Sequence, residues 1–272
     1  MRKTVIEPNG KNFQYWKDLW NYRELAFNLA KRDITVRYKQ TKIGLGWAII
    51  SPIINMVIMT FIFGNLAGLE ADQGSPYFIM VYAGSIPWTL FSSSLNISAN
   101  TFISNATIMK KVYFPRILAP AGSVFAKVID SLVSMAIMLI LMVGAKYFPS
   151  PKILLFPVFM LLCVILGMFA GLFLSAFNVK WRDLQQAIPF LVSVAQYLTP
   201  VMYSINTIPE KYRLLYSLNP ATGIVNAFKW CIIKEMPFDS TSFLIAIAWI
   251  IILIPLGIHF FRKTERTFVD IV

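Results

Sequence analysis

The sequence has few charged residues and few of the side chains that enzymes use for catalysis. Only 14% of its 272 residues are charged, whereas soluble domains carry about a quarter. Asp and Glu total 13, and there are one histidine and two cysteines, Cys163 and Cys231. Two cysteines do not make a disulfide framework, and a lone histidine, His259, leaves no His/Cys cluster for a metal. No paired carboxylates stand at catalytic spacing, so we expect neither a metal site nor catalysis.

The sequence also lacks the P-loop motif G-x-x-x-x-G-K-S/T that cradles nucleotide phosphates. We therefore expect no nucleotide bound through such a loop in this chain. The net charge of +12 would suit nucleic acid. The basic residues stand next to apolar runs, however, as the topology of a membrane protein requires. We expect no nucleic-acid partner.

Apolar residues dominate instead, because 57% of the chain is hydrophobic and the mean hydropathy is +0.63. A membrane-spanning helix needs about 20 mostly apolar residues, and six segments qualify. They are Leu45–Phe63, Tyr77–Thr101, Ile117–Val143, Ile153–Phe177, Leu184–Tyr203 and Phe243–Phe261. These segments predict an all-α polytopic membrane protein, with a six-span domain at residues 43–272 after an N-terminal segment at residues 1–42.

Several residues inside these spans predict how the helices pack. Serines and asparagines crowd the second half of the second span, which should therefore face protein or a wet cavity rather than lipid. Gly167 and Gly171 form a G-x-x-x-G spacing in the fourth span, which permits close contact between helices. The prolines that lie within spans and predict kinks are Pro52, Pro87, Pro189 and Pro200.

The segment Phe13–Tyr38 has the pattern of an amphipathic helix. Its apolar residues at helical spacing are Trp16, Leu19, Trp20, Phe27, Ala30 and Ile34. Tryptophan opposite basic residues favours a helix that lies in the membrane interface among lipids, and the alternative is a soluble helix packed on a partner. Arg37, Lys39 and Lys42 follow directly before the first span, with Trp47 just inside it, as at a cytoplasmic membrane surface.

The distribution of lysine and arginine predicts the orientation of the spans. Six spans place both ends of the chain on one side of the membrane. That side holds the N-terminal segment, the second-to-third and fourth-to-fifth loops and the C-terminal tail, which carry three times as many cations as the opposite side. By the positive-inside rule, both termini are cytoplasmic.

The external segment between the fifth and sixth spans predicts two short helices. Pro209–Leu218 has a charged start, and Asn219-Pro220 supplies an N-cap and a first-turn proline for a helix over Ala221–Ile233. The second helix is too apolar for a solvated loop, so we expect a re-entrant hairpin that dips into the outer half of the membrane. This geometry indicates an external gate, for which the candidates are Pro209, Tyr212, Asn219 and Pro220.

Two further groups of candidate residues lie inside the spans. Lys127 and Asp130, at i,i+3, share one helix face and form either a functional intramembrane pair or a structural pair near the inner interface. Aromatic rings can stack on the C–H faces of sugars and so line a channel, or they can form belts at the two interfaces. The aromatic candidates are Trp47, Tyr82, Trp88, Phe91, Tyr197 and Tyr203.

Five segments, in order along the chain, resemble one family. They are RDITVRYKQTKIGLGWAIISPI at residues 32–53, KKVYFPR at 110–116, NVKWRDL at 178–184, LTPVMYS at 198–204 and LNPATGIVNAFK at 218–229. Together they resemble the membrane subunit of ABC type-2 polysaccharide exporters, the permeases for O-antigen, capsule and teichoic acid polymers. The resemblance extends from about Tyr22 to the end of the sequence.

The resemblance implies a homodimeric permease in the bacterial inner membrane, joined to two copies of a separate ATPase subunit that binds ATP and Mg. It implies export of a polysaccharide linked to a polyprenyl diphosphate, with O-antigen as the leading candidate. In such proteins the N-terminal helix and the second-to-third loop contact the ATPase, which here are Phe13–Tyr38 and Ser104–Arg116. The implied docking residues are Lys110, Lys111, Tyr113, Phe114 and Arg116.

Alternative roles and cargoes stay open at this point. Arg37, Lys39 and Lys42 either attract the diphosphate of the lipid carrier or only set the topology. The cargo could instead be a teichoic acid, a capsule polymer, a drug or a small lipid. A membrane enzyme acting on polyprenyl-linked sugars would need clustered acidic or histidine residues, and an ion-driven transporter would need more than one buried carboxylate. The sequence supplies neither, which favours export driven by the ATPase.

Overall fold

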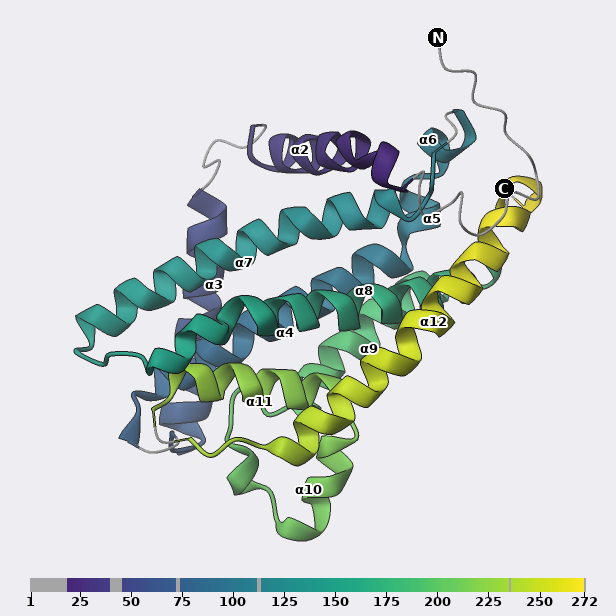
Figure 1. The fold of residues 1–272 in the computed structure, drawn as a ribbon. Helices are drawn as coiled ribbons and strands as arrows, with labels where there is room; N and C mark the ends of the chain where they lie inside the picture. Colours follow the sequence, from purple (N-terminus) through teal and green to yellow (C-terminus); the bar gives the residue numbers. More distant parts are fainter. Residues whose placement is uncertain (1–18, 40–45, 72–73, 112–113, 235, 272) are drawn as a thin grey trace.

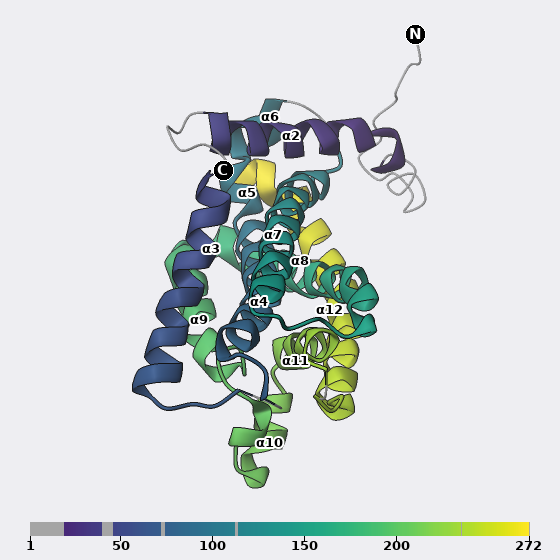
Figure 2. The ribbon, with the colours of Figure 1, turned by 90° about the vertical axis from the view of Figure 1, so that its left-hand side faces the viewer.

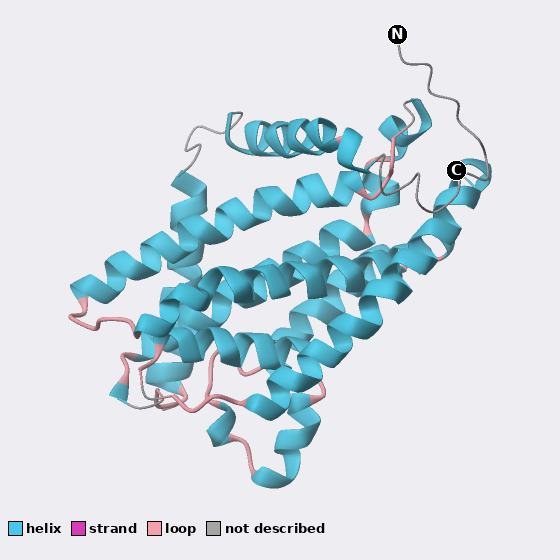
Figure 3. Cartoon of the chain, viewed as in Figure 1, coloured by secondary structure: helices cyan, strands magenta, loops and turns pink. Residues whose placement is uncertain are grey.

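The computed structural model of the chain describes residues 19–39, 46–71, 74–111, 114–234 and 236–271. Within these residues the chain forms helices, turns and loops and holds no strand (Figure 3). Five helical segments are long and apolar enough to cross a membrane. They are Gly46–Leu66, Tyr77–Ala99, Leu118–Gly144, Pro151–Lys180 and Ser240–Glu265. The prediction of an all-helical polytopic membrane protein is confirmed.

These spans and a set of shorter helices follow one another along the chain (Figure 1). The helices that make up the spans are α3 (Gly46–Met59), the π-helix η1 (Thr60–Leu66), α4 (Tyr77–Ala99), α7 (Leu118–Gly144), the 3-10 helix η3 (Pro151–Leu155), α8 (Phe156–Lys180) and α12 (Ser240–Ile271). The shorter helices are α2 (Arg23–Lys39), α5 (Thr101–Ser104), α6 (Ala106–Lys111), α9 (Leu184–Leu198), η4 (Ile205–Thr207), α10 (Glu210–Ser217) and α11 (Pro220–Ile232).

The helix at the fifth predicted span, α9, is shorter than expected. It has 15 residues and ends at Leu198, and the chain stays non-helical through Ser204. Thr199 is extended (φ −103°, ψ 139°), since the helical region is disfavoured for a residue before proline. Pro200 therefore follows the end of a helix and does not kink one, which corrects the prediction. The other predicted kink sites do lie inside helices, at Pro52, Pro87 and Pro189. The six-span topology stays a prediction.

The central helix of the bundle is α4, which packs against α7, α8 and α11. In its apolar stretch 67% of the residues are buried, against 6% in the span formed by α3 and η1. Ser94 and Ser98, in the polar half of α4, are fully buried next to α8. The prediction that this half faces protein rather than lipid is confirmed for these two side chains.

Glycines on α8 explain how closely it approaches α4. A Cβ added at Gly167 would lie 2.5 Å from the carbonyl oxygen of Phe91, and one added at Gly171 would lie 2.4 Å from that of Leu95. Both distances are shorter than van der Waals contact, so the two backbones touch where these residues have no side chain. The close helix contact expected from the G-x-x-x-G spacing is confirmed.

At one end of the bundle, which we call the α2 end, α2 lies across the other helices and packs on α7 (Figures 1 and 2). Ala30 is buried there beside Gly122 of α7, because only small residues fit where two backbones come this close. Trp20 and Phe27 are instead 69% and 63% exposed, and the position of this helix in the membrane interface stays a prediction. The chain also turns at Tyr22, and the start of the predicted helix lies outside the described residues.

The opposite end, which we call the α10 end, carries the helix pair α10 and α11 (Figure 1). Asn219 caps α11, because its Oδ1 accepts a hydrogen bond of 3.1 Å from the N–H of Ala221, and Pro220 occupies the first turn. α10 is largely exposed, whereas every residue from Ala221 to Lys229 is buried among α4, α8 and α12. Both predicted helices and the predicted cap are confirmed. Re-entry of the pair into the membrane stays a prediction.

Replacing Gly171 with alanine should destabilise the protein. The added methyl group would lie 2.4 Å from the carbonyl oxygen of Leu95 and 2.6 Å from Cβ of Ser98, and the two helices cannot separate without uncovering α4. Overpacking of this kind costs about 1–3 kcal/mol. Thermal unfolding of the purified protein in detergent measures the loss. The matched control is Gly144→Ala, whose methyl group would meet nothing within 4 Å. Equal melting temperatures for the two variants would contradict a tight contact between α4 and α8.

Candidate functional site

A polar cavity of about 500 Å³ lies between α3, α4 and α7. It brings together Trp47 and Tyr82, from the predicted aromatic set, and the predicted pair Lys127 and Asp130. Its other polar lining residues carry hydroxyl or amide groups and are Ser51, Asn55, Ser85, Thr89, Ser93, Ser131 and Ser134. Ionisable and polar groups inside membrane-spanning helices are functional candidates by default. We therefore take this α3–α4–α7 cavity as the candidate site.

The ion pair of the cavity is formed within α7. Lys127 Nζ donates a hydrogen bond of 3.3 Å to Asp130 Oδ2, and the two side chains are 25% and 26% exposed. Ser134 Oγ donates to the backbone carbonyl of Asp130 over 3.1 Å. The i,i+3 spacing therefore brings the two charges together, and both line the cavity. Their partial exposure leaves each charge within reach of a polar ligand there.

The two aromatic residues add a hydroxyl group and two rings to the same cavity. Tyr82 is 1% exposed, and its hydroxyl meets the side chain of Ser134 from α7 across the cavity wall. A buried hydroxyl needs such a polar neighbour, and this one joins α4 to α7. Trp47 is 50% exposed at the start of α3. Hydroxyl, amide and charged groups next to aromatic rings are suited to a polyhydroxyl compound.

The other predicted channel aromatics lie elsewhere. Trp88 and Phe91 pack on each other, with ring centroids 5.6 Å apart, and Trp88 is 4% exposed. Tyr197 is 56% exposed on α9, and the hydroxyl of Tyr203 donates to the carbonyl of Tyr197 over 3.0 Å. The chain therefore does not bring all six aromatics to one surface, and their role in a channel stays a prediction.

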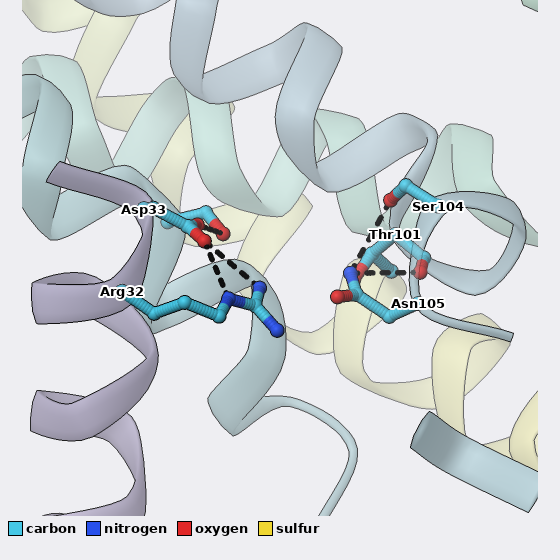
Figure 4. A network of polar contacts seen from close by, with 6 residues as sticks. Arg32, Asp33, Thr101, Ser104 and Asn105 are labelled. Carbon is cyan, nitrogen blue, oxygen red and sulfur yellow. Dashed lines mark hydrogen bonds and ion pairs between the residues drawn. The ribbon is translucent and has the colours of Figure 1, made fainter. Parts of the chain in front are cut away.

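Two more polar cavities lie at the α2 end. One of about 670 Å³ is lined by Arg32 and Asp33 of α2 together with polar residues of α4, α5 and α7. Arg32 is paired with Asp33 at 2.8 Å, and the amide of Asn105 donates to the carbonyl of Thr101 over 3.2 Å (Figure 4). The other, of about 1090 Å³, is lined by α5, the end of α8 and the start of α9. This end of the bundle is thus polar and hollowed.

Of the residues implied in ATPase docking, two hold the chain together. Phe114 is 4% exposed and belongs to an apolar cluster with Phe102 and Phe261. The guanidinium of Arg116 donates to the carbonyl of Glu265 on α12 over 2.5 Å, and its backbone N–H donates to Oε1 of Glu265 over 3.2 Å. Lys110 and Lys111 end α6, but their side chains, like all of Tyr113, lie outside the described residues. The loop is therefore attached to α12, which the sequence pattern did not indicate.

The remaining predicted site residues lie at the two ends of the bundle. At the α2 end, Arg37 and Lys39 belong to the last turn of α2, but their side chains lie outside the described part of the structure. All of Lys42 also lies outside it. At the α10 end, Pro209 precedes α10, and Tyr212 is 47% exposed with Lys211 Nζ 4.6 Å above its ring. Asn219 and Pro220 begin α11, as described above.

Lys229 is a polar residue whose place the sequence analysis missed. It was counted only as an external cation, but its side chain is 1% exposed. Its Nζ donates to the carbonyls of Pro200 and Tyr203, at 2.5 and 3.0 Å. A single lysine near the end of the apolar helix over residues 221–233 was the available signal.

The described residues contain no group of three His, Cys, Asp or Glu side chains able to hold a metal ion. Cys163 and Cys231 are both buried and free.

Comparisons of this sequence with a family model and with individual proteins agree with each other. The sequence matches the family described as ABC-2 type transporter over residues 24–233. It is 25% identical to the O-antigen export system permease protein RfbA of Myxococcus xanthus, over 93% of this chain and 97% of the relative. It is 26% identical to the protein of that name from Klebsiella pneumoniae, over 92% and 95%, and 23% identical to the polysialic acid transport protein KpsM of Escherichia coli, over 86% and 91%. Since the family match covers most of the chain, this protein belongs to the ABC-2 type transporter family.

Proposed function

We propose that this chain is the permease subunit of an ATP-driven exporter that moves a polysaccharide from the cytoplasmic to the external face of the bacterial inner membrane. The observation that carries the proposal is the similarity, over nearly the whole length of both chains, to relatives named for O-antigen export and polysialic acid transport. The α3–α4–α7 cavity supports it, because its hydroxyl, amide and aromatic groups suit a carbohydrate.

The proposed topology has six crossings and both termini in the cytoplasm. The end of α12 and helix α2 lie at the same end of the bundle, which requires an even number of crossings (Figure 1). α9 adds one crossing to the five long spans, since it returns the chain from the end of α8 to α10. The excess of cations on the segments at the α2 end supports a cytoplasmic location for that end.

The proposed energy source is a separate ATPase. The sequence has no P-loop, so ATP and Mg would bind two copies of a partner subunit joined to a homodimer of this chain. α2 and the loop with Lys110, Lys111 and Tyr113 form the docking surface. Phe114 and Arg116 of that loop pass its movement to α12 through the contacts already described. Catalysis in this chain itself has no part in the proposal.

The proposed cargo is O-antigen linked to a polyprenyl diphosphate, whose phosphates would meet Arg37, Lys39 and Lys42 at the α2 end. A capsule polymer is the second candidate, and the relative named for polysialic acid transport favours it. A teichoic acid or another amphiphile would use the same architecture.

Affinity purification of this chain from its native membrane in mild detergent should yield a stoichiometric ATPase subunit and a lipid-linked glycan. Mass spectrometry identifies both, and the glycan names the cargo. Hydrolysis by the purified complex should require ATP and Mg and should depend on the partner subunit. A chain that comes out alone and supports transport without nucleotide would contradict an ATP-driven permease.

Replacing Arg37, Lys39 and Lys42 together with glutamine should weaken cargo binding at least tenfold, because each cation near an anionic surface contributes about 1 kcal/mol. Export of polymer to the cell surface is measured at equal membrane levels of the variants. The matched control replaces three exposed cations of the same side that lie outside α2 and the docking loop, Lys180, Arg182 and Lys263. Unchanged export in a correctly inserted triple variant rejects the headgroup role of the first set.

Replacing Asn55 with leucine should lower export about two- to tenfold, the effect of one lost hydrogen bond to the cargo. Asn55 lines the α3–α4–α7 cavity. Asn65 is exposed near the other end of the same span and gives the matched control, Asn65→Leu. Radiolabelled sugar exported per unit of membrane-inserted protein is the measurement. Equal export by both variants would remove the cavity from the cargo path.

A further inference from the structure

In the chain between α9 and η4, residues 199–204, backbone carbonyl groups accept hydrogen bonds from side chains of other helices. We call these residues the α9 link. Backbone outside a helix has carbonyl groups with no intrahelical partner, and within a membrane each unsatisfied group is costly. The link is nevertheless buried, since Thr199, Val201, Met202 and Ser204 are all at most 4% exposed. Its carbonyls therefore need donors from other elements.

Those donors come from two separate helices. Lys229 of α11 donates to the carbonyls of Pro200 and Tyr203. The hydroxyl of Tyr77, the first residue of α4, donates to the carbonyl of Met202 over 2.6 Å. Asn219, at the start of α11, donates from Nδ2 to Oγ1 of Thr199 over 2.8 Å. Three side chains thus hold one short segment.

Lys229 is the donor best suited to hold the link. An ammonium group carries three donors and no acceptor, so it binds two carbonyls at once. Its side chain lies against α4 at Gly84, where an added Cβ would be 2.7 Å from Lys229 Cε and 2.3 Å from the carbonyl oxygen of Val201. Both the link and the lysine therefore depend on the absence of a side chain at Gly84.

Apart from the link, α9 is loosely attached to the rest of the chain. Ile188 is its one buried side chain, and apolar residues along it are exposed. The exposed residues include Phe190, Leu191, Val194, Tyr197 and Leu198. Movement of α9 relative to α11 must therefore break the bonds that Lys229 and Asn219 make to the link, while beyond the link few contacts resist it.

We propose that Lys229 is a latch that holds the end of α9 against α11 and that its release frees the α9 link to move. The statement that the α10 end is the exit of the transporter rests on the proposed function. The latch itself does not rest on it. In an exporter, a closed latch would keep the external end shut, and the driven cycle would open it. Lys229 is thus a positioning residue that touches no cargo.

The test measures exposure of the link in the purified, detergent-solubilised protein. Met202, which is 2% exposed, is replaced with cysteine, and the buried Cys163 and Cys231 are replaced with alanine. The rate of reaction with a charged thiosulfonate then reports the population in which the link is open. Lys229→Met keeps the apolar stem but removes the donors. It should raise this rate about tenfold or more, as expected for loss of hydrogen bonds from a charged group.

Two further variants approach the latch from α4. Gly84→Ala pushes on the carbonyl of Val201 and on the lysine stem, and should raise the labelling rate as Lys229→Met does. Tyr77→Phe removes one donor and keeps the ring, so it should give a smaller rise even if the other variants fold poorly. The matched controls are Lys234→Met, at an exposed lysine just beyond α11, and Gly144→Ala.

Labelling that rises in Lys229→Met, Gly84→Ala and Tyr77→Phe, but not in the controls, supports the latch. Unchanged labelling in these three variants, or an equal rise in Lys234→Met, overturns it. Export measured in the same variants separates the two proposals. Faster labelling in a protein that exports no polysaccharide, even in its unaltered form, keeps the latch and rejects the proposed function. Altered export with unchanged labelling rejects the latch and keeps the proposed function.

Discussion

The close contact between α4 and α8 is the constraint around which the bundle is arranged. α4 is the least hydrophobic of the spans, and exposing its serines and asparagines to lipid would be costly. α8 encloses that side of α4 because Gly167 and Gly171 let its backbone reach the backbone of α4. α7 and α11 cover other sides of the same helix. A buried polar helix with an apolar, glycine-bearing neighbour is therefore the fixed part of the molecule.

Two helices are left outside this fixed part. α3 runs along the outside of the bundle (Figure 2), and α9 has a single buried side chain. The α3–α4–α7 cavity lies behind the first of them, and the α9 link ends the second. Elements with few buried contacts are those that can move at low free-energy cost. The packing thus separates a rigid centre from two helices that are free to shift, which is an arrangement suited to a transporter.

Signals local in sequence predicted much of this architecture. Apolar runs located the spans, the pair Asn219-Pro220 gave the start of α11, and the i,i+3 spacing gave the ion pair of α7. Contacts between distant segments were not predictable in this way. Arg116 meets Glu265 across 149 positions, and Lys229 meets Pro200 in a segment expected to be helical. The exposure of Phe27 likewise depends on which face of α2 fits against Gly122, and helical spacing alone does not contain that information.

One of the long helices, α12, contacts a proposed functional element at each end of the molecule. α12 is 32 residues long, and near its C-terminal end Glu265 binds Arg116 of the loop that precedes α7. Near its start, α12 touches the backbone of α11. A Cβ added at Gly223 of α11 would lie 2.1 Å from the carbonyl oxygen of Ser242. α11 in turn carries Lys229. A force applied to the loop at the α2 end therefore acts on a helix that presses directly on the element holding the α9 link. Packed helices transmit such a displacement because their contacts leave no free space to absorb it.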